Sequence, residues 1–166
     1  MTEDIGKKAE QKIRQWLNRP EEGYDFNRIP DNMNGFYGSK NICDFDLYKN
    51  PNKYYIESKA TYHDRFDFNM LTDYQLENML KKSQIANVRS LVIVLFVTYQ
   101  RAFIFDIRDI YEQIQSRKKS VNITKIGNWT IPYKEIRTVP SRKQMLDYEG
   151  EIEEFIPNHR DNLAAD

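Results

Sequence analysis

The segment YYIESK, residues 54–59, decides the fold and most of the chemistry that this sequence predicts. Its aromatic and β-branched residues favour a strand, on which successive side chains point to opposite faces. Glu57 and Lys59 therefore share one face, and Ser58 points to the other. Asp44 lies 13 positions before Glu57, in a second strand-like stretch. A hairpin of these two strands would bring two carboxylates and one ammonium group together.

This hairpin predicts a metal site suited to cleavage of a phosphodiester. Mg²⁺ takes only one or two carboxylates and keeps several waters, so Asp44 and Glu57 suffice as ligands, and the backbone carbonyl of Ser58 can add a neutral oxygen. Such a metal makes water nucleophilic and stabilises charge on phosphorus. Lys59 can orient the attacking water, act as a base, or contact the phosphate, and the sequence leaves these three roles open. An acid and a lysine two positions apart also form ordinary, weak surface pairs.

The remaining pattern predicts one α/β domain built around this hairpin. An apolar stripe predicts a helix over residues 2–18, ended by Pro20, with Glu10 on its flank and able to face the rest of the fold. Further strands are predicted over 24–29, 42–48, 53–61, 89–97, 101–107 and 128–133, further helices over 71–85 and 110–115, and a loop over 30–40. This order indicates a mixed central β-sheet flanked by helices.

Composition excludes several classes of protein. The chain has 166 residues, which suits one domain with or without a tail, and no apolar run approaches the ~20 residues of a membrane helix. The acidic start lacks the apolar core of a secretory signal. A single cysteine, Cys43, rules out an internal disulfide and a cysteine-based zinc site, and fits a reducing cytoplasm.

The net charge of zero conceals two regions of opposite sign. Residues 145–166 hold seven acidic residues and one basic residue, which leaves 24 basic and 18 acidic residues, a net charge of +6, in positions 1–144. We therefore predict a nuclease domain over 1–144 and an acidic C-terminal tail over 145–166. A basic body fits a polyanion such as nucleic acid, although a solvated lysine surface explains the charge equally well. The candidate DNA contacts are Lys40, Arg65, Arg117, Lys118 and Lys119.

The candidate site residues also resemble those of a known superfamily. Asp44, the Glu-x-Lys of 57–59 and the early helix with Glu10 resemble the PD-(D/E)xK nucleases. More narrowly, YIESKAT (55–61), FDFNML (66–71), YQLENM (74–79) and SKNICDF (39–45) resemble RecU-type Holliday junction resolvases, including phage and Firmicutes relatives. The resemblance covers about residues 5–110.

The resemblance implies a restriction-endonuclease-like fold, a homodimer with two active sites, a four-way DNA junction as substrate, and dependence on Mg²⁺ or Mn²⁺. It implies a catalytic set of Asp44, Glu57 and Lys59, with Gln75 on the following helix and Glu10 on the first helix shaping the site. The best-known bacterial members carry a long stalk before the first aspartate, whereas segment 30–41 is short here.

Three hypotheses follow from the sequence. The first is a metal-dependent endonuclease that resolves Holliday junctions in recombination. The second is a restriction- or repair-type endonuclease that acts on duplex DNA through the same site. The third is a DNA-binding or recombinase-modulating module without turnover.

Overall fold

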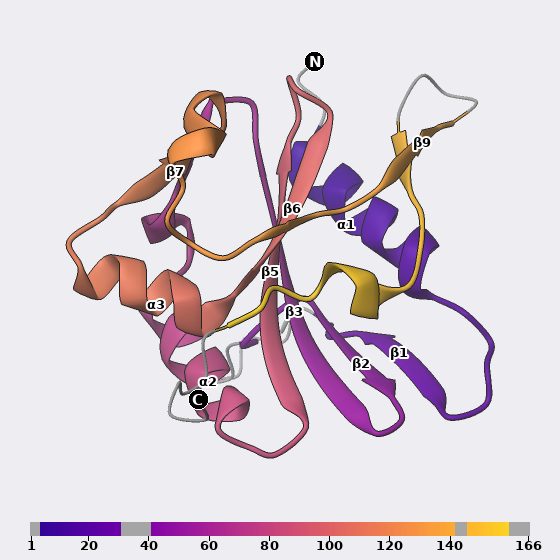
Figure 1. Cartoon of the computed structure of the whole chain (residues 1–166). Helices are drawn as coiled ribbons and strands as arrows, with labels where there is room; N and C mark the ends of the chain where they lie inside the picture. The colour runs from indigo at the N-terminus through magenta and orange to yellow at the C-terminus, as the bar shows by residue number, and fades with distance from the viewer. Residues whose placement is uncertain (1–3, 31–40, 142–145, 160–166) are drawn as a thin grey trace.

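A mixed β-sheet forms the centre of the molecule (Figure 1). The structure is a computed structural model that describes residues 4–30, 41–141 and 146–159. Within these residues the sheet has six strands in the order β1-β2-β3-β5-β6-β8, of which β3 and β5 are parallel and the other neighbours antiparallel. The strands are β1 (Tyr24–Arg28), β2 (Phe45–Lys49), β3 (Asn52–Thr61), β5 (Val88–Phe96), β6 (Arg101–Asp106) and β8 (Lys134–Glu135).

Helices cover both faces of the sheet, which confirms the predicted architecture. Helix α1 (Ile5–Leu17) packs on one face, where Ile13 and Leu17 meet the inward side chains of β2 and β3. Helices α2 (Asp73–Ser83) and α3 (Ile107–Gln115) pack on the other. The second face also carries the pair β4 (Arg65–Asp67) and β7 (Ser120–Asn122), with the short helices η1 (Phe68–Met70) and η2 (Ile123–Asn128). Strand β5, apolar on both sides, separates the two cores.

The predicted hairpin of β2 and β3 is confirmed, and its register positions the candidate site. Phe45 pairs with Ile56, and both side chains are fully buried against α1. Because a shift of one residue would turn both side chains away from this core, the apolar pattern specifies the register. Asp44, directly before β2, consequently lies opposite Glu57.

The predicted edge strand over 128–133 is wrong. In the structure η2 ends at Asn128, and the edge strand β8 begins only at Lys134. Ile131 is buried in the second core, and the Trp129 Nε1–H donates to the Asn122 carbonyl at 2.8 Å, so this segment packs inward. Pro132 has no N–H group for a sheet ladder, and pairing therefore starts after it.

The described part of the predicted acidic tail folds back onto α1. It contains β10 (Leu146–Tyr148), which pairs with β9 (Thr138–Pro140), and the short helix η3 (Ile152–Phe155). The rings of Tyr148 and Phe155 contact Trp16 at centroid distances of 5.7 and 6.0 Å, and the Trp16 Nε1–H donates to the Gly150 carbonyl at 2.8 Å. Gly150 has a φ of +108°, and a Cβ there would lie 2.6 Å from the Glu154 carboxylate, so only glycine fits this turn.

Acidic side chains of this segment form ion pairs with bases of the body. The Arg19 guanidinium holds Glu151 through both carboxylate oxygens, at 2.7 and 2.8 Å. Lys49 lies 2.8 Å from Glu151 and 2.7 Å from Glu153. The tail thereby neutralises basic side chains near the end of α1.

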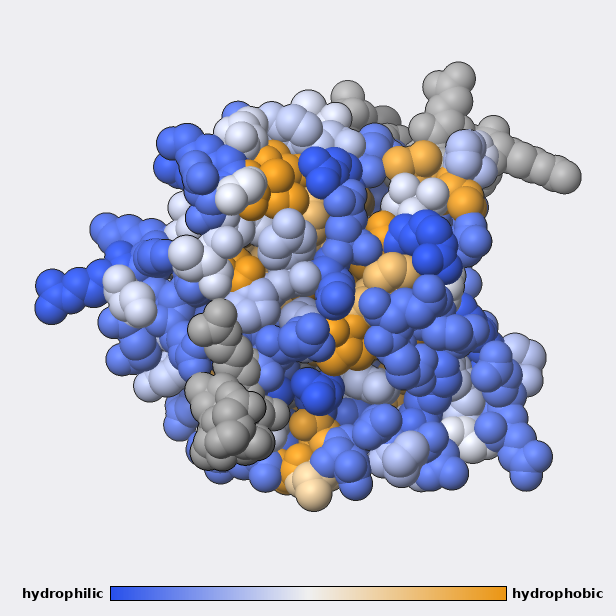
Figure 2. Space-filling model, in the orientation of Figure 1, coloured by the Kyte–Doolittle hydropathy of each residue, from blue (hydrophilic) through white to orange (hydrophobic). Residues whose placement is uncertain are grey.

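None of the helices in residues 4–30, 41–141 and 146–159 combines the length and the apolar character that a membrane crossing requires. On the face seen in Figure 2, apolar residues appear in small patches that hydrophilic residues separate.

Candidate active site

Main-chain hydrogen bonds hold Asp44 at the start of the hairpin. Its backbone N–H donates to the Ile56 carbonyl at 3.1 Å, and its carbonyl accepts the Ile29 N–H at 2.8 Å. Its carboxylate Oδ2 accepts the Ser58 N–H at 2.9 Å. The Asp44 side chain is therefore directed at β3, where Glu57 lies.

Glu57 is almost completely buried, with 3% of its surface exposed. Its Oε2 lies 2.9 Å from the Lys59 Nζ, so Glu57 and Lys59 share a face of β3, as the strand period predicts. Its Oε1 is also buried, and no N–H or hydroxyl group of the described residues donates to it. The neighbouring Asp44 carboxyl hydrogen-bonds to Glu57 when it is protonated. Because a buried carboxylate oxygen is costly to leave unsatisfied, either a proton shared with Asp44 or a cation between the two acids would stabilise this arrangement.

The two carboxyl groups influence each other strongly. Burial, and then the nearby Glu57 carboxylate, raise the pKa of Asp44 to about 7, while the Ser58 N–H and Lys59 oppose this rise only in part. An acid with such a pKa holds its proton more firmly than an exposed aspartic acid does. A cation between Asp44 and Glu57 would favour the ionised form of both.

Lys59 reaches from the sheet toward the first turn of α2. Its Nζ lies 3.5 Å from the Gln75 Oε1, a long contact, and 17% of the lysine side chain is exposed. The same Gln75 oxygen accepts the Thr72 N–H at 3.2 Å, while the Thr72 hydroxyl accepts the Gln75 N–H at 3.1 Å. This capping box begins α2 and fixes the amide next to the lysine.

The pair of carboxylates fits a hard divalent cation that takes few protein ligands. The described residues hold no larger cluster, of three or more His, Cys, Asp or Glu side chains, that could bind a metal. The two converging carboxylates match Mg²⁺ or Mn²⁺, which need few protein ligands, and no N–H or hydroxyl group of the described residues donates to the Glu57 Oε1. Ser58 supplies its N–H to Asp44, and the use of its carbonyl as a ligand stays a prediction.

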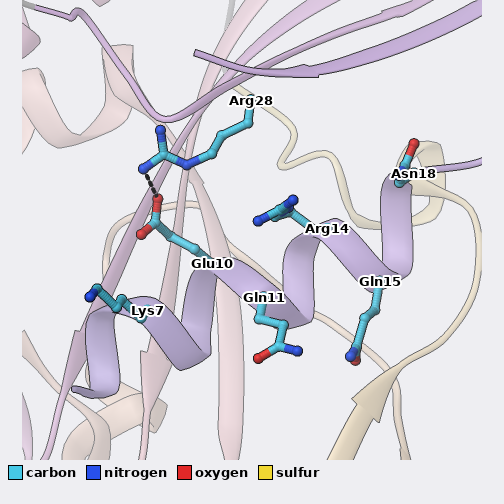
Figure 3. A pocket seen from close by; sticks show the side chains of 7 residues that line it. All are labelled: Lys7, Glu10, Gln11, Arg14, Gln15, Asn18 and Arg28. Carbon is cyan, nitrogen blue, oxygen red and sulfur yellow. Dashed lines mark hydrogen bonds and ion pairs between the residues drawn. The ribbon is translucent and has the colours of Figure 1, made fainter. Parts of the chain in front are cut away.

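Glu10 lies on the α1 side of the sheet, at the margin of the site. Its Oε1 is 2.8 Å from the Arg28 guanidinium, and Figure 3 shows the two side chains pointing toward each other. Arg28 also donates to the Ile29 carbonyl at 2.6 Å, and Ile29 is the residue that donates to Asp44. Sequence reasoning missed Arg28, although a cation ending the alternating face of Tyr24 and Phe26 was a usable signal.

The structure brings three of the five candidate DNA contacts together. Arg65, Lys118 and Lys119 line one groove of about 890 Å³ that also includes the first turn of α2. Arg117 is not part of that lining and occupies the turn after α3, with a φ of +66°. Lys40 and most of the predicted loop over 30–40 lie outside the described residues.

Two neighbours of the site have structural partners. Asp46, which could have been a second metal ligand, pairs with Lys53 at 3.3 Å and accepts from the Asn27 amide at 3.2 Å. Cys43 is 2% exposed and belongs to the second core. The ion pair of Asp46 and the burial of Cys43 account for these two residues without a catalytic role.

Comparisons with known proteins identify the fold. No family model matches the chain, and no curated protein sequence matches it. Among solved structures, the chain is similar to Hjc, a Holliday junction resolvase of the archaeal hyperthermophile Archaeoglobus fulgidus, with a TM-score of 0.50 and 14% identity. The match covers 72% of this chain and 89% of Hjc. The chain therefore has the restriction-endonuclease-like fold of that resolvase, a mixed sheet flanked by helices.

Proposed function

We propose that the protein is a metal-dependent DNA endonuclease that cuts branched DNA, and Holliday junctions in particular. The observation that carries this proposal is the pair of buried carboxyl groups of Asp44 and Glu57, which lie close enough to raise the pKa of Asp44 and stand beside Lys59. No N–H or hydroxyl group of the described residues donates to the Glu57 Oε1, and a cation between the two acids would balance their charge. The RecU-type motifs around these residues and the resolvase fold support the choice of junction DNA.

The chain's own groups have distinct tasks in this chemistry. When bound by Asp44 and Glu57, Mg²⁺ or Mn²⁺ supplies Lewis-acid activation of water and stabilises charge on phosphorus. The Ser58 N–H holds the Asp44 carboxylate in place. Lys59, positioned between Glu57 and Gln75 and partly exposed, orients the attacking water or contacts the scissile phosphate. Gln75 positions Lys59, and Glu10 acts through Arg28 at the margin of the site.

Substrate binding uses the groove beside α2, whose lining holds three basic side chains and two acidic ones, Asp67 and Asp73. Arg65, Lys118 and Lys119 line it, together with Thr72 at the start of α2. Thr72 contacts Gln75, which lies next to Lys59. Phosphate contacts of this kind position DNA without reading its sequence.

A four-way junction requires two cuts, so we propose a homodimer with one site per strand. The lone Cys43, without a disulfide, fits activity in a reducing cytoplasm.

A cleavage assay with synthetic four-way junctions tests the proposal. We expect the purified protein to nick the junction in the presence of Mg²⁺ or Mn²⁺. Lys59→Ala and Asp44→Ala should abolish cutting and retain binding. Lys53→Ala is the matched control, because Lys53 lies on the same strand but pairs with Asp46, away from the site.

The outcomes separate the three hypotheses. Cutting of linear duplex and junction at equal rates would favour a restriction- or repair-type endonuclease and contradict the choice of junction DNA. Binding of DNA without cleavage under any divalent metal would contradict the enzyme and favour a non-catalytic module. Full cleavage by Lys59→Ala would contradict the assigned site.

A further inference from the structure

A second polar pocket, of about 670 Å³, lies between α1 and the end of β1 (Figure 3). Every side chain that lines it is charged or carries an amide, among them Lys7, Gln11, Arg14 and Arg28. No aromatic or purely apolar side chain lines the pocket, so it lacks a ring on which a base could stack. It offers hydrogen-bond donors and positive charge.

The charge of this pocket is carried chiefly by Lys7 and Arg14. The third cation, Arg28, is paired with Glu10 at 2.8 Å. Lys7 and Arg14 are exposed, and no side-chain partner for either occurs in residues 4–30, 41–141 and 146–159. They are seven residues apart on α1, which places them on one face about 10 Å apart along the axis. Figure 3 shows them on either side of Glu10.

Other bases on α1 and at its end are differently engaged. Lys12 is buried and donates to the Leu146 carbonyl. Arg19, just beyond α1, is held by Glu151 of the C-terminal segment. The acidic segment thus neutralises the C-terminal end of the helix, and no acidic side chain of the described residues pairs with Lys7 or Arg14.

The pocket adjoins the candidate active site through β1. Arg28 closes β1, the next residue is Ile29, and the Ile29 N–H donates to the Asp44 carbonyl at 2.8 Å. The groove of Arg65, Lys118 and Lys119 lies on the opposite face of the sheet, beside α2, and Arg65 pairs there with Asp67 at 3.5 Å. A DNA strand held at Asp44 would therefore have Lys7 and Arg14 on one side and Lys118 and Lys119 on the other.

We propose that the α1 pocket binds the phosphodiester backbone of the DNA next to the scissile phosphate. Lys7 and Arg14 each neutralise one phosphate, and the Gln11 amide donates to a backbone oxygen. This inference rests on the proposed function, since it names a further contact surface for the same substrate. Binding through phosphates alone is independent of sequence, and its strength falls with salt.

Salt dependence of DNA binding tests this proposal. Affinity of the full-length protein for a synthetic four-way junction is measured in EDTA, so that no strand is cut, over a range of NaCl concentrations. Each phosphate contact contributes about 0.9 to the slope of log affinity against log salt. Lys7→Gln/Arg14→Gln should lower the slope by about 1.8, so that a roughly fourfold rise in salt costs the wild type about 12-fold more affinity than the variant.

Matched variants separate a specific contact from bulk charge. Lys81→Gln/Lys125→Gln removes two exposed charges outside both pockets and should leave the slope unchanged. Lys7→Arg/Arg14→Lys keeps the charges and should retain the wild-type slope, and each single Gln variant should lower it by about 0.9.

The possible results are distinguishable. An unchanged slope in Lys7→Gln/Arg14→Gln, with normal binding by the wild type, would overturn the pocket and leave the nuclease proposal standing. An equal loss in the Lys81→Gln/Lys125→Gln control would overturn it too, because bulk charge would then explain the effect. A wild-type protein that binds no DNA at all would overturn both proposals.

Discussion

Asp44→Asn should stabilise the metal-free protein at neutral and higher pH. An aspartic acid in the unfolded chain titrates near 4, whereas burial and Glu57 raise the pKa of Asp44 to about 7 in the folded state. Between these values the folded state holds a proton that the unfolded state has released. This group therefore lowers stability as pH rises from about 4 to about 7, and the full penalty persists above pH 7. Asparagine cannot ionise, so it removes the penalty.

The expected gain follows from the two pKa values. A difference of about 3 corresponds to about 4 kcal/mol at 1.36 kcal/mol per pKa unit. The asparagine Oδ1 can still accept the Ser58 N–H, and the effect of this bond on the ionised acid is already part of the pKa of Asp44. We therefore expect Asp44→Asn to be about 4 kcal/mol more stable than the wild type at pH 8, and about equal to it near pH 4.

Urea unfolding in EDTA, at several pH values between 4 and 8, measures this difference. Asp46→Asn is the control, because Asp46 lies two residues away but pairs with Lys53, and its gap from the wild type should not grow with pH. Excess Mg²⁺ at pH 8 should stabilise the wild type by about 2.7 kcal/mol at 100 times the dissociation constant, and Asp44→Asn far less. If the difference in unfolding free energy between Asp44→Asn and the wild type stays constant from pH 4 to 8, the raised pKa of Asp44 is refuted.

Other contacts give further predictions. Gln75→Ala removes both the capping box and the Lys59 contact, so it should lower the free energy of unfolding by about 1 kcal/mol and slow cleavage. Thr72→Ala should lose a similar amount of stability but cleave DNA faster than Gln75→Ala does, because it keeps the Lys59 contact. Equal cleavage rates for the two variants would contradict the positioning role of Gln75. Trp16→Phe loses its bond to the C-terminal segment and should cost about 1–2 kcal/mol and speed proteolysis there; an unchanged digestion pattern would speak against the contact. Tyr148→Phe removes a buried hydroxyl without a partner in the described chain, so the melting temperature should hold or rise, and a clear fall would show that the hydroxyl is bonded.

Local patterns were sufficient to predict the hairpin and the centre of the site. Alternation of buried and partly exposed residues in β2 and β3 sets which side chains face α1, and Asn50-Pro51-Asn52 marks the turn. Once the strands pair, Asp44 must stand opposite Glu57, and Lys59 must lie on the same face as Glu57. The three side chains are close in sequence, which is why their proximity was predictable, whereas their catalytic role stays a proposal.

Contacts between distant segments were not predictable from the sequence. Trp16 bonds to Gly150 across 134 positions, and the charge pattern of the tail suggested only its sign. The pairing of Glu10 with Arg28 depends on how α1 crosses β1, which no periodicity specifies. The wrong prediction for 128–133 has the same origin. The segment favours a strand locally, but the burial of Ile131 and the missing N–H of Pro132 keep it out of the sheet.

The side-chain oxygen Oε1 of Gln75 contacts two donors, the Thr72 N–H and the Lys59 ammonium group, and this restricts which residues can replace Gln75. A capping box tolerates glutamate as well as glutamine, so Gln75→Glu would preserve the start of α2. The same exchange would place a second anion beside Lys59, in competition with Glu57 for one ammonium group. Helix initiation therefore admits two side chains at position 75, whereas charge balance around the lysine admits one. The local folding code and the electrostatics of the site impose separate requirements on a single oxygen atom.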